Sequence, residues 1–185
     1  KQKLDPIRGV ISDKNGKPLA MNIDYLGRTI RFYPGGETTV SIVGYLGKPS
    51  ESDLRDCALC NPEMTVGKAG MEKGYQNDLM GEPGEAIIQE TADGQNKVEI
   101  NRTESIPGKN IQTNIDFELQ KMAFLAIKNK FKEVGKSGVV IIARVSGEVL
   151  ALASVPSFDP NLFISNGKRS DFGGDFKDAD SLIND

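Results

Sequence analysis

The chain has 185 residues, of which 38% are hydrophobic and 26% charged, and its formal net charge is −3. This length allows one generous domain or two small ones, and the scattered lysines and arginines form no basic stripe for nucleic-acid phosphates. We therefore expect no nucleic-acid partner. Histidine is absent, which excludes His-based triads and removes the commonest transition-metal ligand. We also expect no metal and no cofactor.

The N-terminal region predicts a β-hairpin followed by a strand. Residues 9–11 and 18–21 are short apolar segments on either side of DKNG, where Asn15 and Gly16 supply the positive φ angles of a tight turn. Residues 29–33 alternate polar and apolar side chains and then stop at Pro-Gly-Gly, which is typical of a strand that ends in a turn.

Residues 37–47, ETTVSIVGYLG, fit either a strand or a helix. Their β-branched side chains favour a strand. Glu37, directly after the glycines, favours a helix start, and the sequence leaves both interpretations open.

The chain has two cysteines, Cys57 and Cys60, and they form a C-x-x-C pair. This spacing suits a local disulfide, a redox dithiol or half a zinc site. A zinc site needs two more ligands, so we favour a local disulfide or a plain loop pair.

Residues 67–84, GKAGMEKGYQNDLMGEPG, surround a short amphipathic segment with glycines. Met71, Tyr75 and Leu79 recur every four residues, with Glu72 in the first turn and a glycine after the last apolar position. This pattern predicts a short helix with a glycine stop at Gly81, held to the domain by the three apolar side chains. The glycines lack the spacing of a phosphate-binding loop, so we interpret the segment as a structural joint.

The region from residue 85 to residue 115 predicts a small antiparallel sheet. Its strand-like segments are residues 85–91, 97–103 and 110–115. An Asp-Gly turn at 93–94 and a Pro-Gly turn at 107–108 separate them.

Residues 117–134 predict a long helix. Asp116 is a good N-cap, lysines gather toward the C-terminal end, and Gly135 follows. The apolar stripe that we expect on the helix is formed by Leu119, Met122, Ala123, Ala126 and Ile127.

A second hairpin is predicted near the C-terminal end. Two apolar runs, residues 139–143 and 149–153, flank a turn at Ser146 and Gly147. Apolar side chains on both faces indicate strands that are covered on both sides, with the preceding helix as one cover. Both runs are much shorter than the roughly 20 residues of a membrane span, and from this sequence we expect no signal peptide.

Five motifs occur along the chain in the order seen in class B penicillin-binding proteins. They are RGVISDKNGKPLA, RFYPGG with VGYLG, GKAGMEKGYQNDLMGEPG, PGKNIQTNIDFELQ and SGEVLALASVPSFDPNLF. The chain therefore resembles this family over nearly its whole length, and its PSFDPNLF ending is more similar to the elongation type than to the division type.

This resemblance implies an α+β fold with two parts. Residues 1–113 would form a pedestal domain that does not bind penicillin, a small antiparallel sheet with short helices. Residues 114–185 would form the first helix and β-hairpin of a β-lactamase-like transpeptidase domain. Because the chain begins at Lys1 inside sequence that already has a folded pattern, we expect a fragment or a mature form.

The resemblance also implies a function for the parent protein. Members of the family are anchored by one N-terminal helix in the cytoplasmic membrane and work on its periplasmic side, cross-linking peptidoglycan stem peptides through an acyl-serine intermediate. They partner with a SEDS-family glycosyltransferase and a rod-complex scaffold protein, largely through the pedestal. Stem peptides and β-lactams would bind only to the full-length parent.

Within the matching motifs we single out a set of candidate structural residues. They are Arg8, Gly9, Asp13, Asn15, Gly16, Arg31, Tyr33, Pro34, Gly44, Gly70, Glu72, Tyr75, Leu79, Gly81, Gly84, Asp116, Gln120, Gly147, Pro156, Pro160 and Asn161. Arg8, Arg31 and Glu72 lie in the three motifs that converge in the family's pedestal, so we predict that Glu72 pairs with one or both arginines. The alternative is three solvated charges that contribute little.

No catalytic residue is predicted. Acylation in this family needs Ser-x-x-Lys, then Ser-x-Asn, then Lys-Thr/Ser-Gly. The chain has loose matches to the first and third motifs, SNGK at 165–168 and KSG at 136–138, but they come in the wrong order and no Ser-x-Asn is present. Ser165 also precedes an Asn-Gly turn rather than a helix. We therefore expect this chain to be catalytically silent.

One departure from the family lies between Asn22 and Ile23. The family usually carries a long head segment at this joint, and here it was either deleted or dropped from the sequence. Partner binding through the head segment therefore does not transfer to this chain.

Two rival interpretations remain. A stand-alone interaction module would lack a catalytic half, but the apolar hairpin at 139–154 would then need further strands and helices to cover it. A C-x-x-C redox module would show thiol reactivity or disulfide exchange.

Overall fold

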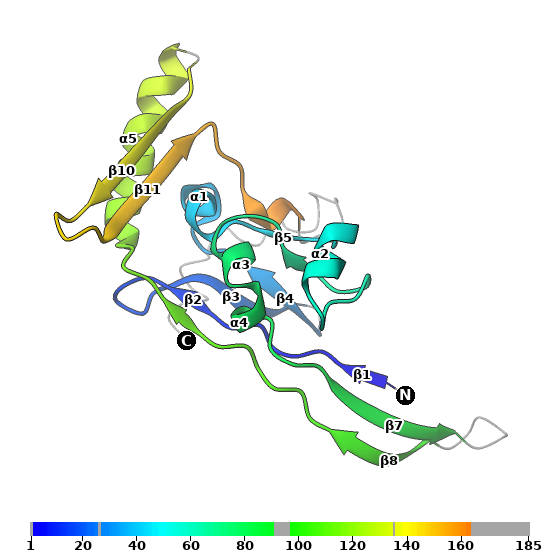
Figure 1. Cartoon of the computed structure of the whole chain (residues 1–185). Helices are drawn as coiled ribbons and strands as arrows, with labels where there is room; N and C mark the ends of the chain where they lie inside the picture. Colours follow the sequence, from blue (N-terminus) through cyan, green and yellow to red (C-terminus); the bar gives the residue numbers. More distant parts are fainter. Residues whose placement is uncertain (1, 26, 91–96, 135, 164–185) are drawn as a thin grey trace.

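The computed structural model describes residues 2–25, 27–90, 97–134 and 136–163. They form small, mostly antiparallel sheets with several short helices and one long helix, so the predicted α+β class is confirmed (Figure 1). A central part lies between two arms. One arm is an extended strand pair within residues 84–103, and the other is the long helix with its hairpin within residues 117–155.

The central sheet has the strand order β4-β3-β2-β9. Its strands are β2 (Ile11–Ser12), β3 (Pro18–Tyr25), β4 (Arg28–Phe32) and β9 (Ile111–Gln112). The turn between β2 and β3 is built on Asp13, whose buried carboxylate accepts hydrogen bonds from the backbone nitrogens of Asn15 at 2.7 Å and Lys17 at 2.8 Å. Gly16 adopts φ 86° there, so the predicted hairpin and its turn are confirmed.

Strand β3 continues without interruption through Asn22 and Ile23, the position where a head segment was expected. In its antiparallel pairing with β4, Asn22 lies opposite Arg31 and Ile23 lies opposite Ile30. Gly27 has φ 72° just before β4 begins. In this chain β3 therefore pairs directly with β4 on both sides of the position where the head segment was expected.

The segment for which the sequence left strand and helix open is helical in its first part. A 3-10 turn η1 (Gly36–Thr38) leads into α1 (Val40–Val43), after which β5 (Leu46–Gly47) pairs with β6 (Val66–Gly67). Thr39 and Val43 are fully buried, so burial of this face against the core outweighs the strand preference of the β-branched side chains. Gly44, at φ 76°, ends α1.

The glycine-rich segment forms two short helices rather than the single predicted helix. They follow α2 (Glu51–Asp56) in the chain and are α3 (Gly70–Gly74) and α4 (Gln76–Leu79). Tyr75 interrupts them with ψ 28° and is 48% exposed, whereas Leu79 is fully buried. The prediction that Tyr75 holds the helix to the domain is wrong, because the break at this residue turns it away from the buried face. Gly81 follows with φ 71°, so the glycine stop is confirmed.

A second sheet extends away from the central part (Figure 1). Its strands, in the order β1-β7-β8, are β1 (Gln2–Leu4), β7 (Gly84–Glu90) and β8 (Lys97–Thr103). The predicted turn at 93–94 lies outside the described residues.

The third predicted strand of this region does not join that sheet. Strand β9 pairs in parallel with β2, because residues 107–110 bring the chain back beside residues 7–10. There the backbone nitrogen of Gly108 donates to Ile7 at 2.9 Å and that of Ile111 donates to Val10 at 2.8 Å. The prediction of one antiparallel sheet for residues 85–115 is therefore wrong in its last strand.

The long helix α5 (Phe117–Val134) begins after Asp116, whose Oδ1 accepts a hydrogen bond from the backbone nitrogen of Leu119 at 3.1 Å. The predicted N-cap is confirmed. The predicted apolar stripe is partly wrong, since Met122 is 62% exposed and Ala126 is also exposed. The face that packs against the following hairpin keeps Leu119, Ala123 and Ile127 of the predicted stripe and adds Gln120 and Phe124. The predicted helix stop at Gly135 lies outside the described residues.

The C-terminal hairpin packs against α5 (Figure 1). Its strands are β10 (Gly138–Ala143) and β11 (Val149–Val155), and η2 (Pro160–Phe163) follows them. Gly147 forms the predicted turn with φ 100°. Ala151 is buried on the α5 side, whereas Val139 and Ile141 on the opposite face are 63% and 60% exposed. The cover by α5 is confirmed, and within the described residues the second face lacks the cover that was expected.

The main hydrophobic core lies between the central sheet, the short helices and the start of α5. Its largest fully buried apolar side chains are Tyr33, Ile11, Leu19, Leu79 and Val43. They come from widely separated parts of the chain, and they hold the short helices against the sheet. This packing carries Glu72 of α3 into the interior.

Replacing Gly44 by alanine is predicted to destabilise the fold. A Cβ atom there would overlap the backbone oxygen of Ala69, and the residue also has φ 76°. We expect Gly44→Ala to lower the free energy of unfolding by about 2 kcal/mol or more, measured by urea denaturation. Gly74→Ala is the matched control, because a Cβ there meets no described atom within 4 Å. Equal effects of the two substitutions would contradict the close contact at Gly44.

Candidate functional site

Glu72 lies in the first turn of α3, and its side chain is 0% exposed. Two glycines allow the Glu72 side chain to be buried. A side chain at Gly67 would overlap the backbone carbonyl of Glu72, and one at Gly70, which has φ 56°, would overlap the backbone that ends α1. The close backbone approach at both glycines places the start of α3 deep enough for Glu72 to point inward.

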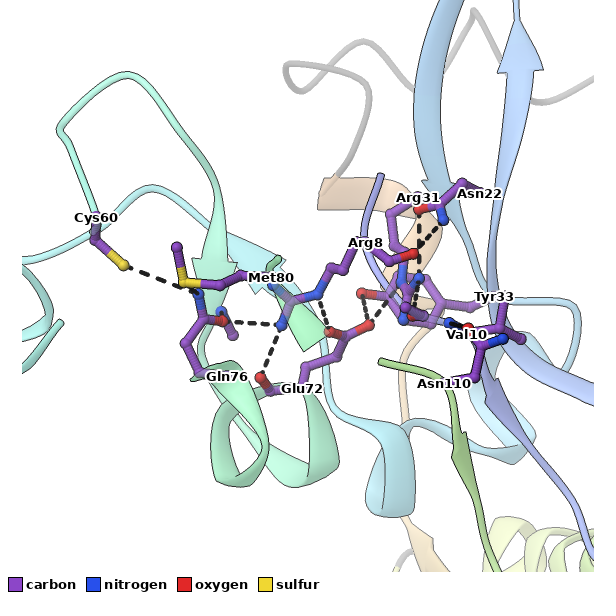
Figure 2. Close-up of polar contacts among 12 residues, drawn as sticks. Arg8, Val10, Asn22, Arg31, Tyr33, Cys60, Glu72, Gln76, Met80 and Asn110 are labelled. Atoms are coloured by element: carbon purple, nitrogen blue, oxygen red, sulfur yellow. Dashed lines mark hydrogen bonds and ion pairs between the residues drawn. The ribbon is translucent and has the colours of Figure 1, made fainter. Parts of the chain in front are cut away.

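Two arginines from distant parts of the chain meet the Glu72 carboxylate (Figure 2). Arg8 Nε donates to Oε2 at 2.6 Å, and Arg31 Nε donates to Oε1 at 2.8 Å. The Tyr33 hydroxyl donates to Oε1 at 3.3 Å. The side chains of Arg8 and Arg31 are 10% and 3% exposed, so the predicted pairing is confirmed and the alternative of solvated charges is wrong.

Gln76 extends this contact along the helices. Its Oε1 accepts hydrogen bonds from Arg8 Nη2 at 2.8 Å and from the backbone nitrogen of Gly67 at 2.9 Å. Arg8 Nη2 also donates to the backbone oxygen of Glu72 at 2.9 Å. Gln76 was not among the predicted residues, although its place four residues after Glu72 on a predicted helix is a usable signal for a shared face.

Asn22 joins the two arginines from the other side. Its Nδ2 donates to the backbone oxygen of Arg8 at 2.5 Å, and its Oδ1 accepts from Arg31 Nη1 at 3.3 Å. Arg31 Nη1 also donates to the backbone oxygen of Gly9 at 2.8 Å. Asn22 was missed as well, because its place opposite Arg31 depends on the strand register. We call the set of six side chains the arginine–glutamate cluster: Arg8, Asn22, Arg31, Tyr33, Glu72 and Gln76.

The charges of this cluster do not balance. Two guanidinium groups face one carboxylate, which leaves one positive charge in excess. Burial lowers the pKa of Arg8, and the adjacent Glu72 opposes this shift. Burial, followed by the charge of Glu72, raises the pKa of Tyr33 far above its usual value, so the hydroxyl stays protonated and acts as a donor. Tyr33 therefore supplies no compensating negative charge.

This arrangement suits binding and bracing rather than acid–base catalysis. Guanidinium groups stay protonated in proteins, and the Glu72 oxygens are already occupied by three donors. Within the described residues, no set of three or more His, Cys, Asp and Glu side chains could hold a metal ion.

A disulfide lies next to the cluster. Cys57 and Cys60 are bonded to each other, in agreement with the favoured local disulfide. Gln76 Nε2 lies 3.9 Å from Cys60 Sγ and 3.5 Å from Met80 Sδ (Figure 2). The amide of Gln76 thus connects the disulfide loop with Arg8.

Two further predicted residues, Gln120 and Asn161, form side-chain hydrogen bonds to the backbone of distant segments. Gln120 is fully buried; its Nε2 donates to the oxygens of Thr38 at 2.6 Å and Leu152 at 2.9 Å, and its Oε1 accepts from the nitrogen of Leu152 at 2.7 Å. Asn161 accepts from the backbone nitrogen of Tyr33 and donates to its oxygen, both at 3.0 Å. These residues connect the C-terminal arm to the segment that follows β4.

The other predicted residues lie outside the cluster, apart from Gly9 and Gly70 at its edge. Asp13, Asn15 and Gly16 form the first hairpin turn, and Asp116 caps α5. Gly44, Gly81 and Gly147 have positive φ angles, and Gly84 lies against the backbone of Thr103. Leu79 and Pro160 are buried, Pro156 follows a cis peptide bond, and Pro34 is half-buried in the turn after β4. Their role as a family motif stays a prediction.

The loose matches to catalytic motifs gain no support. Lys136 is exposed between α5 and β10, and residues 165–168 lie outside the described part of the chain. Among the described residues, no helix is both long and apolar enough to cross a membrane.

Comparison with a known family model gives a match over half of the chain. The model of the penicillin-binding protein dimerisation domain covers residues 21–113. This range contains Asn22, Arg31, Tyr33, Glu72 and Gln76, whereas Arg8 lies before it.

Curated relatives are peptidoglycan D,D-transpeptidases. MrdA of Acinetobacter baumannii is 30% identical over 144 residues, which is 77% of this chain and 21% of the relative. MrdA of Escherichia coli K12 is 28% identical over 169 residues, 88% of this chain and 25% of the relative. FtsI of Escherichia coli K12 is 30% identical over 133 residues, 71% of this chain and 20% of the relative. The chain thus spans a quarter or less of the length of each.

Two solved structures have similar folds. PBP2 of Pseudomonas aeruginosa in complex with WCK 5153 has a TM-score of 0.67 and 34% identity, covering 88% of this chain and 32% of that one. A complex between PBP2 and MreC from Helicobacter pylori has a TM-score of 0.67 and 20% identity, covering 88% of this chain and 44% of that one. The second shows similarity of fold alone.

Removing the Glu72 charge is predicted to destabilise the protein strongly. Glu72→Gln leaves two buried guanidinium groups without a carboxylate, and breaking a buried pair in this way costs about 3–5 kcal/mol. Urea denaturation would measure the loss. The matched control is Glu118→Gln, because Glu118 pairs with Lys17 at the surface and is 68% exposed. An effect of Glu72→Gln as small as that of the control would contradict a charged, bracing role for Glu72.

Proposed function

Because this chain belongs to the penicillin-binding protein dimerisation domain family, we propose that it is the pedestal of an elongation-type peptidoglycan D,D-transpeptidase. In this role it holds the catalytic domain at a distance from the membrane and offers a surface to partners. The observation that carries the proposal is the arginine–glutamate cluster, which joins residues 8, 31 and 72 in one buried contact. A spacer domain needs this kind of internal bracing.

The proposed domain boundary lies near residue 113. Residues 1–113 would be the pedestal, and residues 114–185 would begin the transpeptidase domain. The family match ends at residue 113, and α5 with its hairpin has a hydrophobic cluster of its own. The exposed apolar side chains of Val139 and Ile141 favour a sheet that continues in the parent protein rather than a stand-alone module.

The elongation type is supported by the coverage of the relatives. The two MrdA proteins match 77% and 88% of this chain, whereas FtsI matches 71%. The parent would be a serine-type transpeptidase that acts on stem peptides and binds β-lactams, and the present chain would have no catalytic activity of its own.

We further propose partners and a location from the family resemblance and from one similar structure. The Helicobacter pylori PBP2 is described in complex with MreC, which supports a rod-complex scaffold protein as a partner of the pedestal. A SEDS-family glycosyltransferase is the second proposed partner. The parent would be a single-pass protein of the cytoplasmic membrane with this part in the periplasm, where the Cys57–Cys60 disulfide would persist.

The pedestal role predicts that the chain needs a catalytic half in order to react with penicillin. The chain alone should give no band after labelling with fluorescent penicillin. A fusion in which it replaces the matching region of Acinetobacter baumannii MrdA should be labelled, because the fusion contains the remaining transpeptidase domain. Gel fluorescence with excess unlabelled penicillin as competitor measures both.

Two outcomes would contradict this account. Covalent labelling of the chain alone, for instance at Ser165, would show that it carries its own nucleophile. A fusion that has native circular dichroism but no labelling would show that the chain cannot replace the pedestal.

A further inference from the structure

A cavity of about 560 Å³ opens beside the arginine–glutamate cluster. Its walls come from residues 5–8, from β4, and from the loop at 63–65. Arg8, Arg28 and Arg31 line it together, and Ile30 and Leu46 add apolar surface. Its volume falls in the range of ligand-binding pockets, and it combines apolar walls with a few polar groups. Nothing in the proposed role of the pedestal uses this cavity.

The charge of the cluster favours an anion in the cavity. Arg8 and Arg31 share one carboxylate, so one positive charge is in excess behind the cavity wall. Arg31 Nη2 is buried and has no hydrogen-bond partner among the described residues. Since that atom is shielded from solvent, a ligand in the cavity is attracted by its charge, whereas Arg28 is exposed and can contact the ligand directly. Excess positive charge in a poorly solvated region is stabilised by a nearby negative group.

The edge of the central sheet favours an extended peptide. Strand β4 is at the end of the strand order β4-β3-β2-β9, and in the described chain no strand pairs with its outer edge. Residues 28–31 of this strand line the cavity, together with Asn22 of β3 and residues 5–8. An edge strand can accept a further strand through main-chain hydrogen bonds, with pockets beside it for the side chains of the added peptide.

We propose that this cavity binds an extended peptide segment of a partner, which adds to the edge of β4 and places one carboxylate side chain against Arg8 and Arg28. This site does not depend on the proposed function, because it is defined by residues of this chain alone.

Two acidic residues restrict the ligand. Asp5 and Glu63 also line the cavity, but both are exposed, and neither forms an ion pair with an arginine within the described residues. They are solvated and do not neutralise the buried charge. They would repel a ligand with several acidic residues, so the site selects a single carboxylate with neutral neighbours.

The experiment is an NMR titration of the 185-residue chain with the peptide Ac-Thr-Val-Glu-Val-Thr-amide. We expect saturable shifts at the amides of residues 28–31 and at the Nε–H signals of Arg8 and Arg31. The glutamine peptide, Ac-Thr-Val-Gln-Val-Thr-amide, should bind at least about tenfold more weakly, because it lacks the charge that the arginines recognise. Equal affinity of the two peptides, or shifts confined to other surfaces, would overturn the proposal.

Two variants and one small anion complete the test. Arg28→Gln should weaken binding of the glutamate peptide by about threefold without unfolding the chain, since Arg28 is exposed. Arg144→Gln, which changes an exposed arginine near the second hairpin turn, should leave the affinity unchanged. Sodium acetate should bind at least about tenfold more weakly than the glutamate peptide. Acetate binding as tight as the peptide would overturn the peptide part of the proposal, and equal affinities of the Arg28 and Arg144 variants would overturn the location.

Discussion

The burial of the Glu72 carboxylate is the constraint on which the rest of the structure depends. An ionised carboxylate without solvent needs positive charge and hydrogen-bond donors close by. The fold supplies them from the segment before β2, through Arg8, and from β4, through Arg31 and the adjacent Tyr33. One side chain on a five-residue helix thereby fixes the relative positions of three segments that are far apart in the sequence.

The backbone is shaped to make that contact possible. Glycines occupy places where chain segments lie too close for a side chain: Gly9 beside Lys109, Gly67 beside Glu72, and Gly108 beside Leu79. The glycine-rich segment is therefore a joint that seats α3 against its neighbours. Gln120 extends the connection outward, since its amide joins α5 to β11 and to the segment before α1. The arginine–glutamate cluster and Gln120 therefore brace the central part and its attached arm, in line with the proposed pedestal role.

Local patterns predicted the elements well where neighbouring residues determine them. The turn on Asp13 and Gly16, the cap at Asp116 and the second hairpin depend on short-range chemistry. The pairing of Glu72 with the arginines came from a family resemblance, because nothing in the spacing of residues 8, 31 and 72 indicates contact. The pairing of strand β9 and the burial of Tyr75 were mispredicted, since both depend on how distant segments pack. Asn22 escaped notice for the same reason: its role depends on the register of β3 with β4.

A double-mutant cycle between Arg31 and Glu72 tests the central claim most directly. In the unmodified chain, Arg31→Gln should lower the free energy of unfolding in urea, because it removes a partner of a buried carboxylate. In the Glu72→Gln background the same change should raise the free energy of unfolding, because it removes a buried positive charge that has lost its counterion. An equal loss in both backgrounds would contradict the claim that one shared carboxylate holds these segments together.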